Sequence, residues 1–384
     1  MKPWSIFLLA AILPCTVKSQ SVIIEVTNNA PFARAVETIE VPLTEIVGLF
    51  GRAAAESVGV FWGDTQIVSQ KIDESGDDTA DVLIFQSGFG EGEHKKFVVR
   101  TAGGTKVAPP VTDAKYILPR KDVAWENDRI AFRIYGGPLA GDVLNGIDVW
   151  AKRVRYHITD KWYHGDSLKG NARISYHVDH GEGADFFLVG RTLGAGGSAR
   201  RVGEKVNQAG MFSSYSIKAT GPIRSLFSVT YRRDSSNGSS LMEEKIYTLD
   251  AGMNLNKIEV RYPAGPDSGA PTAVGLVKRS KTKPKGDAEE GWLSLWGQTD
   301  DDSSSGFLGT GVVLPPTSKC TIIEDSLHHL IVGTADLPNH FTYYAGAGWT
   351  KSGDFASEAS WQEYLTLAAR ALRSPLQVTI SLRK

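Results

Sequence analysis

The stretches FSVTYRRD (Phe227–Asp234) and EEKIYTL (Glu243–Leu249) decide the fold class. In both, apolar or β-branched residues alternate with polar ones, and this period of two is typical of strands that bury one face. The dipeptide Asn237-Gly238 lies between them and favours the type I′ turn of a β-hairpin. The two stretches therefore predict an antiparallel hairpin.

The same alternation recurs along most of the chain, with Gly, Asn and Asp between the runs. The other stretches that show it are SVIIEVTN (21–28), ARAVETIEVPL (33–43), DVLIFQSGF (81–89), KKFVVRT (95–101), DRIAFRIYG (128–136), ARISYHV (172–178), NKIEVRYP (256–263), HHLIVGTAD (328–336) and LQVTISLRK (376–384). So many strands predict a mainly β protein, a single large antiparallel sandwich over residues 20–384 whose sheets curve around a cleft. GGTKVAPP (103–110) marks a candidate seam between a smaller amino-terminal part and the rest.

One stretch near the carboxyl end predicts a helix instead. Ser360 and Glu363 have the spacing of a capping box, and Ser374-Pro375 ends the pattern. The apolar residues that fall on one helical face are Trp361, Leu365, Ala368, Ala369 and Leu372. A second stretch, NGIDVWAKRVRYHITDKWY (145–163), fits both a helix and a strand, and the choice stays open.

Residues 1–19 have the composition of a secretory signal peptide. Lys2 precedes an apolar run from Ile6 to Leu13, which is too short to cross a bilayer. We therefore expect a secreted protein, extracellular or periplasmic, that has no membrane anchor after cleavage. Cys15 would leave with this leader, so Cys320 can form no intrachain disulfide.

The charge balance argues against nucleic acid as a partner. The chain has 42 basic and 43 acidic residues, and the basic residues are scattered apart from one short run that acidic residues follow. A serine-type triad is poorly supported as well, because no Gly-x-Ser-x-Gly elbow is present.

Alternation in DRIAFRIYGGPL (128–139) places two arginines and a tyrosine on one face. Ile130, Phe132 and Ile134 should be buried together, which leaves Arg129, Arg133 and Tyr135 on the opposite face of the strand. These three residues could form an anion-binding surface. The alternative is an outer strand face with ordinary solvated arginines.

The stretch YHVDHGEGAD (176–185) is the strongest candidate for chemistry. We expect a strand as far as Asp179, in which Ile174, Tyr176 and Val178 point to one side and Arg173, Ser175, His177 and Asp179 to the other, followed by an irregular turn at the glycines. Histidine titrates near neutrality, and a neighbouring carboxylate fixes its tautomer. His177 or His180 with Asp179 or Asp185 is therefore a plausible general acid/base pair.

Two other interpretations of this stretch remain open. His177, Asp179, His180 and Asp185 include enough ligands for a divalent metal, although their spacing matches no specific metal signature. In the third interpretation, the histidines bond loop backbone and have no chemistry. We expect no cofactor.

Four blocks of the chain resemble a known family. They are ENDRIAFRIYGGPL (126–139), GIDVWAKRVRYHITDKWYH (146–164), YHVDHGEGADFFLVGRTLGAGGSA (176–199) and HFTYYAGAGWTKSG (340–353). Together they resemble the family known as domain of unknown function 4861, over most of the mature chain. The resemblance implies a galactose-mutarotase-like β-supersandwich and a role in the breakdown of uronate-containing polysaccharides such as ulvan; relatives include a proposed oligosaccharide dehydratase. Bacterial members usually have Tyr-Asp-Pro-Tyr after the HGEG block, whereas this chain has Phe186 and Phe187 after Asp185.

The function we expect is β-elimination on a uronate oligosaccharide, by a dehydratase or a lyase. That reaction needs a base, a cation beside the carboxylate and an acid for the leaving oxygen. The candidates for acid or base are His177, His180 and Tyr176, with Asp179 as a partner, and those for the cation are Arg129, Arg133 and Lys161. Further residues expected to bind substrate are Tyr135, Trp162, Tyr163, Asp185, Arg191, Tyr343, Tyr344 and Trp349. The alternatives are a mutarotase or epimerase with the same acid/base pair, and a glycan-binding protein without catalysis.

Overall fold

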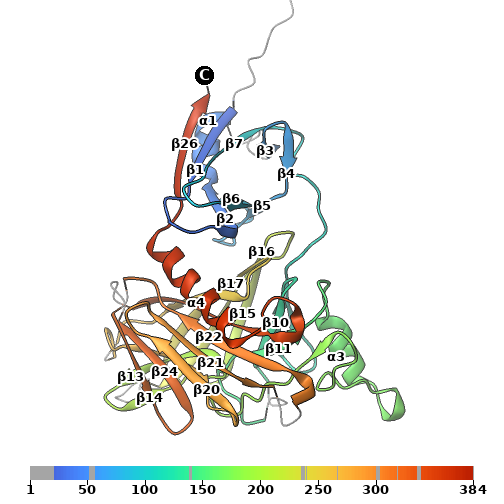
Figure 1. The fold of residues 1–384 in the computed structure, drawn as a ribbon, viewed down its shortest axis with the longest axis vertical. Coiled ribbons are helices and arrows are strands. Elements are labelled where there is room, and N and C mark those ends of the chain that lie inside the picture. Colours follow the sequence, from blue (N-terminus) through green and yellow to red (C-terminus); the bar gives the residue numbers. More distant parts are fainter. Residues whose placement is uncertain are drawn as a thin grey trace, which may run out of the picture.

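The structure is a computed structural model that describes residues 21–51, 57–137, 141–234, 238, 240–265, 267–299, 303–317, 319–334 and 339–383 (Figure 1). The leader expected at residues 1–19 lies outside these ranges, as does Asn237 of the expected turn, so both stay predictions. In the described part, no helix combines the length and the apolar character that a membrane crossing requires.

The smaller of two regions forms the upper part of the molecule in Figure 1. This region contains two antiparallel sheets. In sheet order, the first consists of β26 (Gln377–Arg383), β1 (Ser21–Thr27), β7 (His94–Thr101), β3 (Val58–Trp62) and β4 (Thr65–Ile67). The second consists of β2 (Arg34–Pro42), β6 (Val82–Phe89) and β5 (Ser69–Ile72). Helix α1 (Leu43–Phe50) follows β2 directly. The region has its own core, in which Phe85 and Phe97 pack against each other.

The larger region contains two further antiparallel sheets. In sheet order, the first consists of β14 (Lys205–Asn207), β13 (Ala195–Val202), β19 (Thr272–Val277), β24 (His328–Thr334) and β23 (Lys319–Glu324). The second consists of β15 (Phe212–Ala219), β16 (Arg224–Asp234), β17 (Ser240–Asp250), β18 (Leu255–Arg261), β25 (His340–Trp349), β22 (Phe307–Val313), β21 (Trp292–Gln298) and β20 (Thr282–Asp287). Side chains from both sheets, such as Val274 and Ile258, share one large core.

A third sheet of the larger region carries the candidate site. In sheet order it consists of β12 (Gly183–Ala184), β11 (Asp148–Lys152), β10 (Ile130–Ile134), β9 (Asp122–Glu126) and β8 (Asp113–Ile117). The helix α3 (Thr159–Ser167) and the short 3-10 turn η2 (Gly170–Ala172) follow β11 in the chain. The ambiguous stretch 145–163 is therefore a strand that leads into a helix.

Helix α4 (Glu358–Arg373) lies across β21 and β22 (Figure 1). Trp361 and Leu365 pack against this sheet at Gly309 and Gly311, where an added Cβ would lie 2.6 Å from Trp361 and 2.7 Å from Leu365. The predicted helix and its apolar face are confirmed, but the predicted capping box is wrong. Ser357 is the N-cap and exchanges hydrogen bonds with Ser360, which places Glu363 inside the helix. Two short 3-10 turns, η3 (Ser303–Ser305) and η4 (Thr350–Ser352), complete the helical elements of the described residues.

The predicted mainly β, antiparallel sandwich is confirmed. Strands β16 and β17 pair from Arg224↔Asp250 to Asp234↔Ser240, as the opening stretches predict. Residues 103–110 contain no helix or strand and connect the two regions between β7 and β8, and β26 returns the carboxyl end to pair with β1 (Figure 1). The strand expected at 172–178 is wrong, because those residues follow α3 as turns and irregular backbone.

Candidate functional site

Strand β10 is buried on both faces, and this determines where its arginine lies. Ile130, Phe132 and Ile134 point into the main core, as alternation predicts. The other face is covered by aromatic side chains from β11, α3 and the segment after it, including Trp150. Arg133 is consequently only 4% exposed, so it is neither a solvated surface residue nor open to a ligand in this structure.

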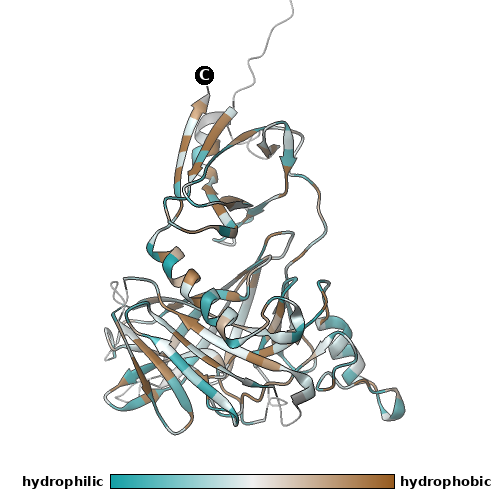
Figure 2. Cartoon of the chain, viewed as in Figure 1, coloured by the Kyte–Doolittle hydropathy of each residue, from teal (hydrophilic) through white to brown (hydrophobic). Residues whose placement is uncertain are grey.

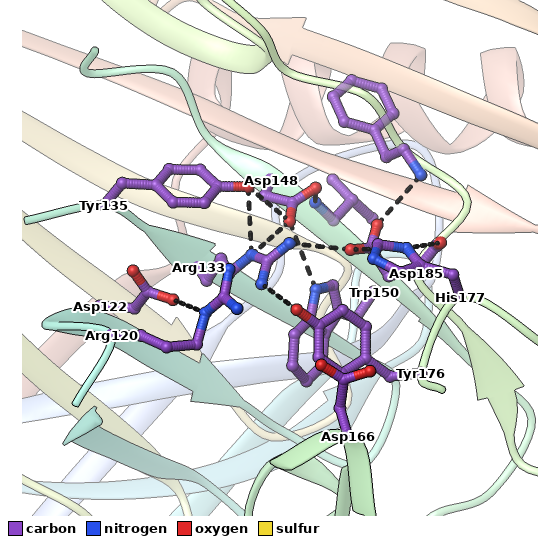
Figure 3. Close-up of polar contacts among 12 residues, drawn as sticks. Arg120, Asp122, Arg133, Tyr135, Asp148, Trp150, Asp166, Tyr176, His177 and Asp185 are labelled. Atoms are coloured by element: carbon purple, nitrogen blue, oxygen red, sulfur yellow. Dashed lines mark hydrogen bonds and ion pairs between the residues drawn. The ribbon is translucent and has the colours of Figure 1, made fainter. Parts of the chain in front are cut away.

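The Arg133 guanidinium is the centre of a buried hydrogen-bond network (Figure 3). Its Nε donates to the Asp148 carboxylate at 2.6 Å and to the Tyr135 hydroxyl at 3.1 Å. Its Nη1 donates to the Tyr176 hydroxyl at 3.1 Å, and its Nη2 to the Asp185 carboxylate at 2.8 Å. The Tyr135 hydroxyl also donates to Asp148, at 2.9 Å. Arg133 therefore joins strands β10 and β11 to both ends of the 176–185 segment.

Burial dominates the electrostatics of this network. Burial raises the pKa of Asp185 well above its ordinary value, the Asp148 carboxylate raises it further, and Arg133 opposes both. Burial also opposes the charge on Arg133, but Asp148, Tyr135 and Asp185 hold its pKa well above the ordinary value. The guanidinium therefore keeps its charge, and Asp185 holds a proton to a higher pH than an exposed carboxyl does.

Residues 176–185 form a closed loop. The Asp185 N–H donates to the Tyr176 carbonyl at 2.8 Å, which joins the two ends of the stretch. Inside the loop, the Asp179 carboxylate accepts from the N–H groups of Gly181 at 2.8 Å and Gly183 at 3.0 Å. Gly183 has a φ of +116°, and a Cβ there would lie 1.9 Å from a neighbouring backbone oxygen, so the position requires glycine.

His177 lies at the edge of the Arg133 network, next to Asp185 (Figure 3). Its side chain is 51% exposed, and its Nδ1 lies 3.1 Å from the Asp185 carbonyl oxygen and 3.5 Å from the Asp185 carboxylate. Because a carbonyl oxygen only accepts hydrogen bonds, this contact assigns the proton to Nδ1. The Nε2 lone pair then has no partner among the described residues and is available to a ligand.

The second histidine and the proposed metal ligands do not gather around one point. His180 is exposed and forms no hydrogen bond or ion pair with the described residues. Asp179 is bound by Arg153 at 2.7 Å and by loop N–H groups, whereas Asp185 is bound by Arg133. Within the described ranges, no group of three or more His, Cys, Asp or Glu residues could hold a metal ion.

A second ion pair, between Arg120 and Asp122 at the start of β9, lies beside the Arg133 network (Figure 3). The buried Asp122 carboxylate accepts from Arg120 Nε and from the Tyr163 hydroxyl, both at 3.1 Å. Arg120 is close enough to Tyr176 and Arg133 for their charges to affect its pKa. Burial lowers this pKa and Tyr176 raises it, and the pKa ends above its ordinary value. Its two Nη atoms have no hydrogen-bond partner among the described residues. Arg120 is thus a cation with unused donors beside Tyr176.

Helix α3 is fixed to the sheet by a buried ion pair. Lys152 Nζ lies 2.6 Å from the Glu126 carboxylate, and both side chains are 0% exposed. The same carboxylate accepts from the N–H groups of Ile158 and Thr159, each at 2.9 Å, at the start of the helix. A carboxylate is favourable there because the first N–H groups of a helix have no partner inside it. This contact fixes the position of the α3 side chains.

Glu182 of the loop binds three side chains near α3. Lys161 Nζ donates to its Oε1 at 2.7 Å, the Tyr156 hydroxyl donates to the same oxygen, and Trp162 Nε1 donates to Oε2 at 3.2 Å. Burial opposes ionisation, but hydrogen bonds from Lys161, Tyr156 and Trp162 together lower the pKa of Glu182. Lys161, expected as a cation for substrate, is therefore paired, although its side chain is 66% exposed.

Most aromatic residues expected to bind sugar are buried. Trp162 and Tyr163 pack against Trp150 with ring centroids 5.4 and 4.9 Å apart. Tyr343 and Trp349 are at most 1% exposed, and neighbouring Tyr344 is half-buried and packs against the α4 side of the sheet. All three residues lie on β25, a strand inside the eight-stranded sheet.

The remaining predicted arginines lie apart from Arg133. Arg129 contacts Asp128 at 3.1 Å and also binds Asp354. Arg191 is exposed in a loop, with its guanidinium 3.7 Å from Asp142. The structure therefore brings together Arg133, Tyr135, Tyr176, His177 and Asp185 from the predicted set, and it separates Arg129 and Arg191 from them.

Four residues of the site are not among those predicted from the sequence: Arg120, Asp122, Asp148 and Trp150. A signal for Asp148 exists, because a charged residue directly before Val149-Trp150 in a strand pattern must find a buried partner. The same reasoning applies to Asp122 in front of VAWE (123–126).

Comparisons with known proteins agree with this architecture. A protein from Formosa agariphila, "Uncharacterized protein P7", is 33% identical over 383 residues, with 94% of each chain covered. A solved structure of a protein in glycosyl hydrolase family 38 from Enterococcus faecalis is similar with a TM-score of 0.53 at 11% identity. The match covers 95% of this chain and 48% of that protein. At this low identity the likeness shows the fold alone. The sequence profile described as "Domain of unknown function (DUF4861)" matches residues 26–378. The chain belongs to the DUF4861 family.

Proposed function

We propose that the protein is a carbohydrate-active enzyme that acts on uronate-containing oligosaccharides by β-elimination, with His177 as the proton-transfer residue. The observation that carries the proposal is the geometry of His177. Its Nδ1 is held by the Asp185 carbonyl at 3.1 Å, and its Nε2 has no partner among the described residues on a half-exposed ring. A histidine held in this way has a defined tautomer and a basic nitrogen directed to a ligand.

Among the other residues of the site, Arg120 is best suited to bind the uronate carboxylate. Arg120 offers unused N–H donors to a uronate carboxylate, because its Nε alone is bound, by Asp122 at 3.1 Å. Arg133 is less suited to this role, since Asp148, Asp185 and two tyrosines already occupy its donors. Tyr176 is no better placed to act as the acid, because it is only 5% exposed and its hydroxyl accepts from Arg133 at 3.1 Å.

The proposed reaction balances without a cofactor. His177 Nε2 takes the proton from the carbon next to the carboxylate, and the electrons of that C–H bond form a double bond to the adjacent carbon. The C–O bond on the adjacent carbon breaks, and its oxygen leaves with a proton from solvent. Loss of water makes the enzyme a dehydratase, and loss of a glycosidic oxygen makes it a lyase. Arg120 stabilises the negative charge that develops on the carboxylate.

Two further features support this substrate class. The family block at 176–199, which carries the resemblance to uronate-degrading relatives, includes the loop that holds His177. The fold is shared with a glycosyl hydrolase family 38 protein, which makes carbohydrate chemistry a natural class to test first. We further propose that the protein acts outside the cell or in the periplasm, on the composition of residues 1–19.

The test supplies uronate oligosaccharides and follows the ultraviolet absorbance of a double bond conjugated to the carboxylate. We expect absorbance to rise, and mass spectrometry to separate loss of water from chain cleavage. Arg120→Met should reduce turnover of uronate substrates, and Arg129→Met, which removes an arginine paired with Asp354, serves as the matched control. A change at the anomeric carbon or at another stereocentre without new absorbance would replace elimination by mutarotation or epimerisation.

A further inference from the structure

Tyr156 is an exposed aromatic ring beside the site loop. It is 55% exposed, and its ring has no aromatic or cationic partner among the described residues. Strand β11 pairs with Gly183 and Ala184 at the end of the loop, and the Arg153 N–H donates to the Glu182 carbonyl at 2.9 Å. Tyr156 follows three residues later, so its backbone position is tied to the loop that carries His177.

The Tyr156 hydroxyl is fixed although its ring is open. It donates to Glu182 Oε1, the oxygen that also accepts from Lys161 at 2.7 Å. Trp162 holds the second carboxylate oxygen at 3.2 Å. Hydrogen bonding to Glu182 raises the pKa of Tyr156, so the phenol keeps the proton that makes this bond. The ring is therefore oriented before any ligand arrives, which reduces the entropy that binding must remove.

Apolar side chains of the site loop and of the segment before it are exposed as well. Val178, the residue after His177, is 54% exposed, and Ile174 is 53% exposed. Lys161, with 66% of its side chain exposed, lies beside the Tyr156 hydroxyl and can donate to a ligand hydroxyl or carboxylate. An open aromatic face with a polar donor at its edge matches a pyranose, whose C–H face is apolar and whose rim is polar.

We propose that Tyr156 is the stacking platform of a second sugar subsite, next to the one in which His177 acts, so that the substrate is an oligosaccharide and not a monosaccharide. This inference rests on the proposed function for the subsite at His177. Glu182 is a positioning residue in this account, because it fixes the ring through the hydroxyl without contacting the sugar face. The ligand class is a glycan of at least two pyranose units that contains a uronate.

Binding measured against chain length tests the subsite. Calorimetry would compare glucuronate with a disaccharide and a tetrasaccharide of glucuronic acid and a neutral sugar. The wild type should bind the longer ligands more tightly than glucuronate. Tyr156→Ala should weaken oligosaccharide binding roughly two- to tenfold, the range expected for one aromatic contact, and leave glucuronate binding unchanged. Tyr156→Phe keeps the ring and loses the hydrogen bond to Glu182. Its affinity for the oligosaccharides should lie between those of the wild type and Tyr156→Ala.

The matched control is Tyr215→Ala. Tyr215 lies on β15, is 44% exposed and stacks on Tyr116 with ring centroids 4.3 Å apart, outside the site. It should retain the length dependence of the wild type. The proposal is overturned if Tyr156→Ala keeps that length dependence, if the wild type shows none, or if no saccharide binds. Failure of the proposed function gives a different result. In that case His177→Gln retains full turnover, and its binding affinity still increases with oligosaccharide length.

Discussion

The candidate site has two halves, which differ in how their polar atoms are used. The strand half, on β10 and β11, contains Arg133 and Asp148, whose side chains are at most 5% exposed and bind one another at 2.6 Å. The loop half, residues 176–185 with the neighbouring Tyr156, exposes about half of His177 and Tyr156. The comparison indicates that the strands hold the site in place, whereas the loop keeps hydrogen-bonding capacity free for a ligand.

The largest expected effect is on stability, at the strand half. Arg133→Met leaves Asp148 and Asp185 buried without their cation, and removing one partner of such a network costs about 3–5 kcal/mol. Denaturant unfolding measures this loss. Arg173→Met is the control, since its ion pair with Asp166 is half-exposed and contributes no more than about 1 kcal/mol. Equal losses in both variants would remove the distinction between the halves.

A smaller effect is expected at the contact that fixes α3. Glu126→Gln keeps the shape of the side chain but removes the charge that binds Lys152 and the helix N–H groups. Burial lowers the pKa of Lys152, so the amine can lose its proton once Glu126 is gone, and the main loss is that of hydrogen bonds to a charged group. The free energy of unfolding should therefore fall by about 1.5–3 kcal/mol. Because Lys161 and Trp162 lie on α3, oligosaccharide affinity should fall as well. Unchanged stability would show that α3 is held by its packed aromatic residues alone.

The smallest stability effect concerns pH. Burial raises the pKa of Asp122, and the arginines at 133 and 120 oppose this. A carboxyl with a raised pKa binds its proton more tightly in the folded state, so stability is lost as pH rises through that pKa. Asp122→Asn should therefore gain stability relative to the wild type as the pH rises from about 4, the ordinary pKa of an aspartate, through the raised pKa of the folded state, by about 1.4 kcal/mol for each unit of pKa shift. The opposite slope would mean that Arg120 determines the titration.

Alternation predicts the strands well and their surroundings poorly. It assigns Ile130, Phe132 and Ile134 to one face, and the structure agrees. It cannot show that the opposite face is also covered, because the covering side chains of α3 and the loop are distant in sequence or fall in a segment whose type is ambiguous. Arg133 is therefore found in the interior, where its partners Asp148 and Asp185 are 15 and 52 residues away.

For the loop, the sequence indicates the chemistry but not the backbone structure. The polar residues of 176–185 mark it as a place for chemistry, but ARISYHV alternates like a strand although it is not one. Contacts that form only in three dimensions decide its shape: Asp185 bonds Tyr176, and Asp179 accepts from Gly181 and Gly183. The sequence pairs both histidines with carboxylates, whereas the fold gives a partner to His177 alone.

The most direct test of the account compares His177→Gln with His180→Gln. Both variants are measured for melting temperature and for turnover of a uronate oligosaccharide in the same preparation. We expect unchanged melting temperatures in both variants, a loss of roughly a hundredfold or more in turnover for His177→Gln, and wild-type turnover for His180→Gln. Wild-type turnover in His177→Gln, or a parallel loss of melting temperature and activity, would contradict the claim that the exposed loop carries the proton-transfer residue.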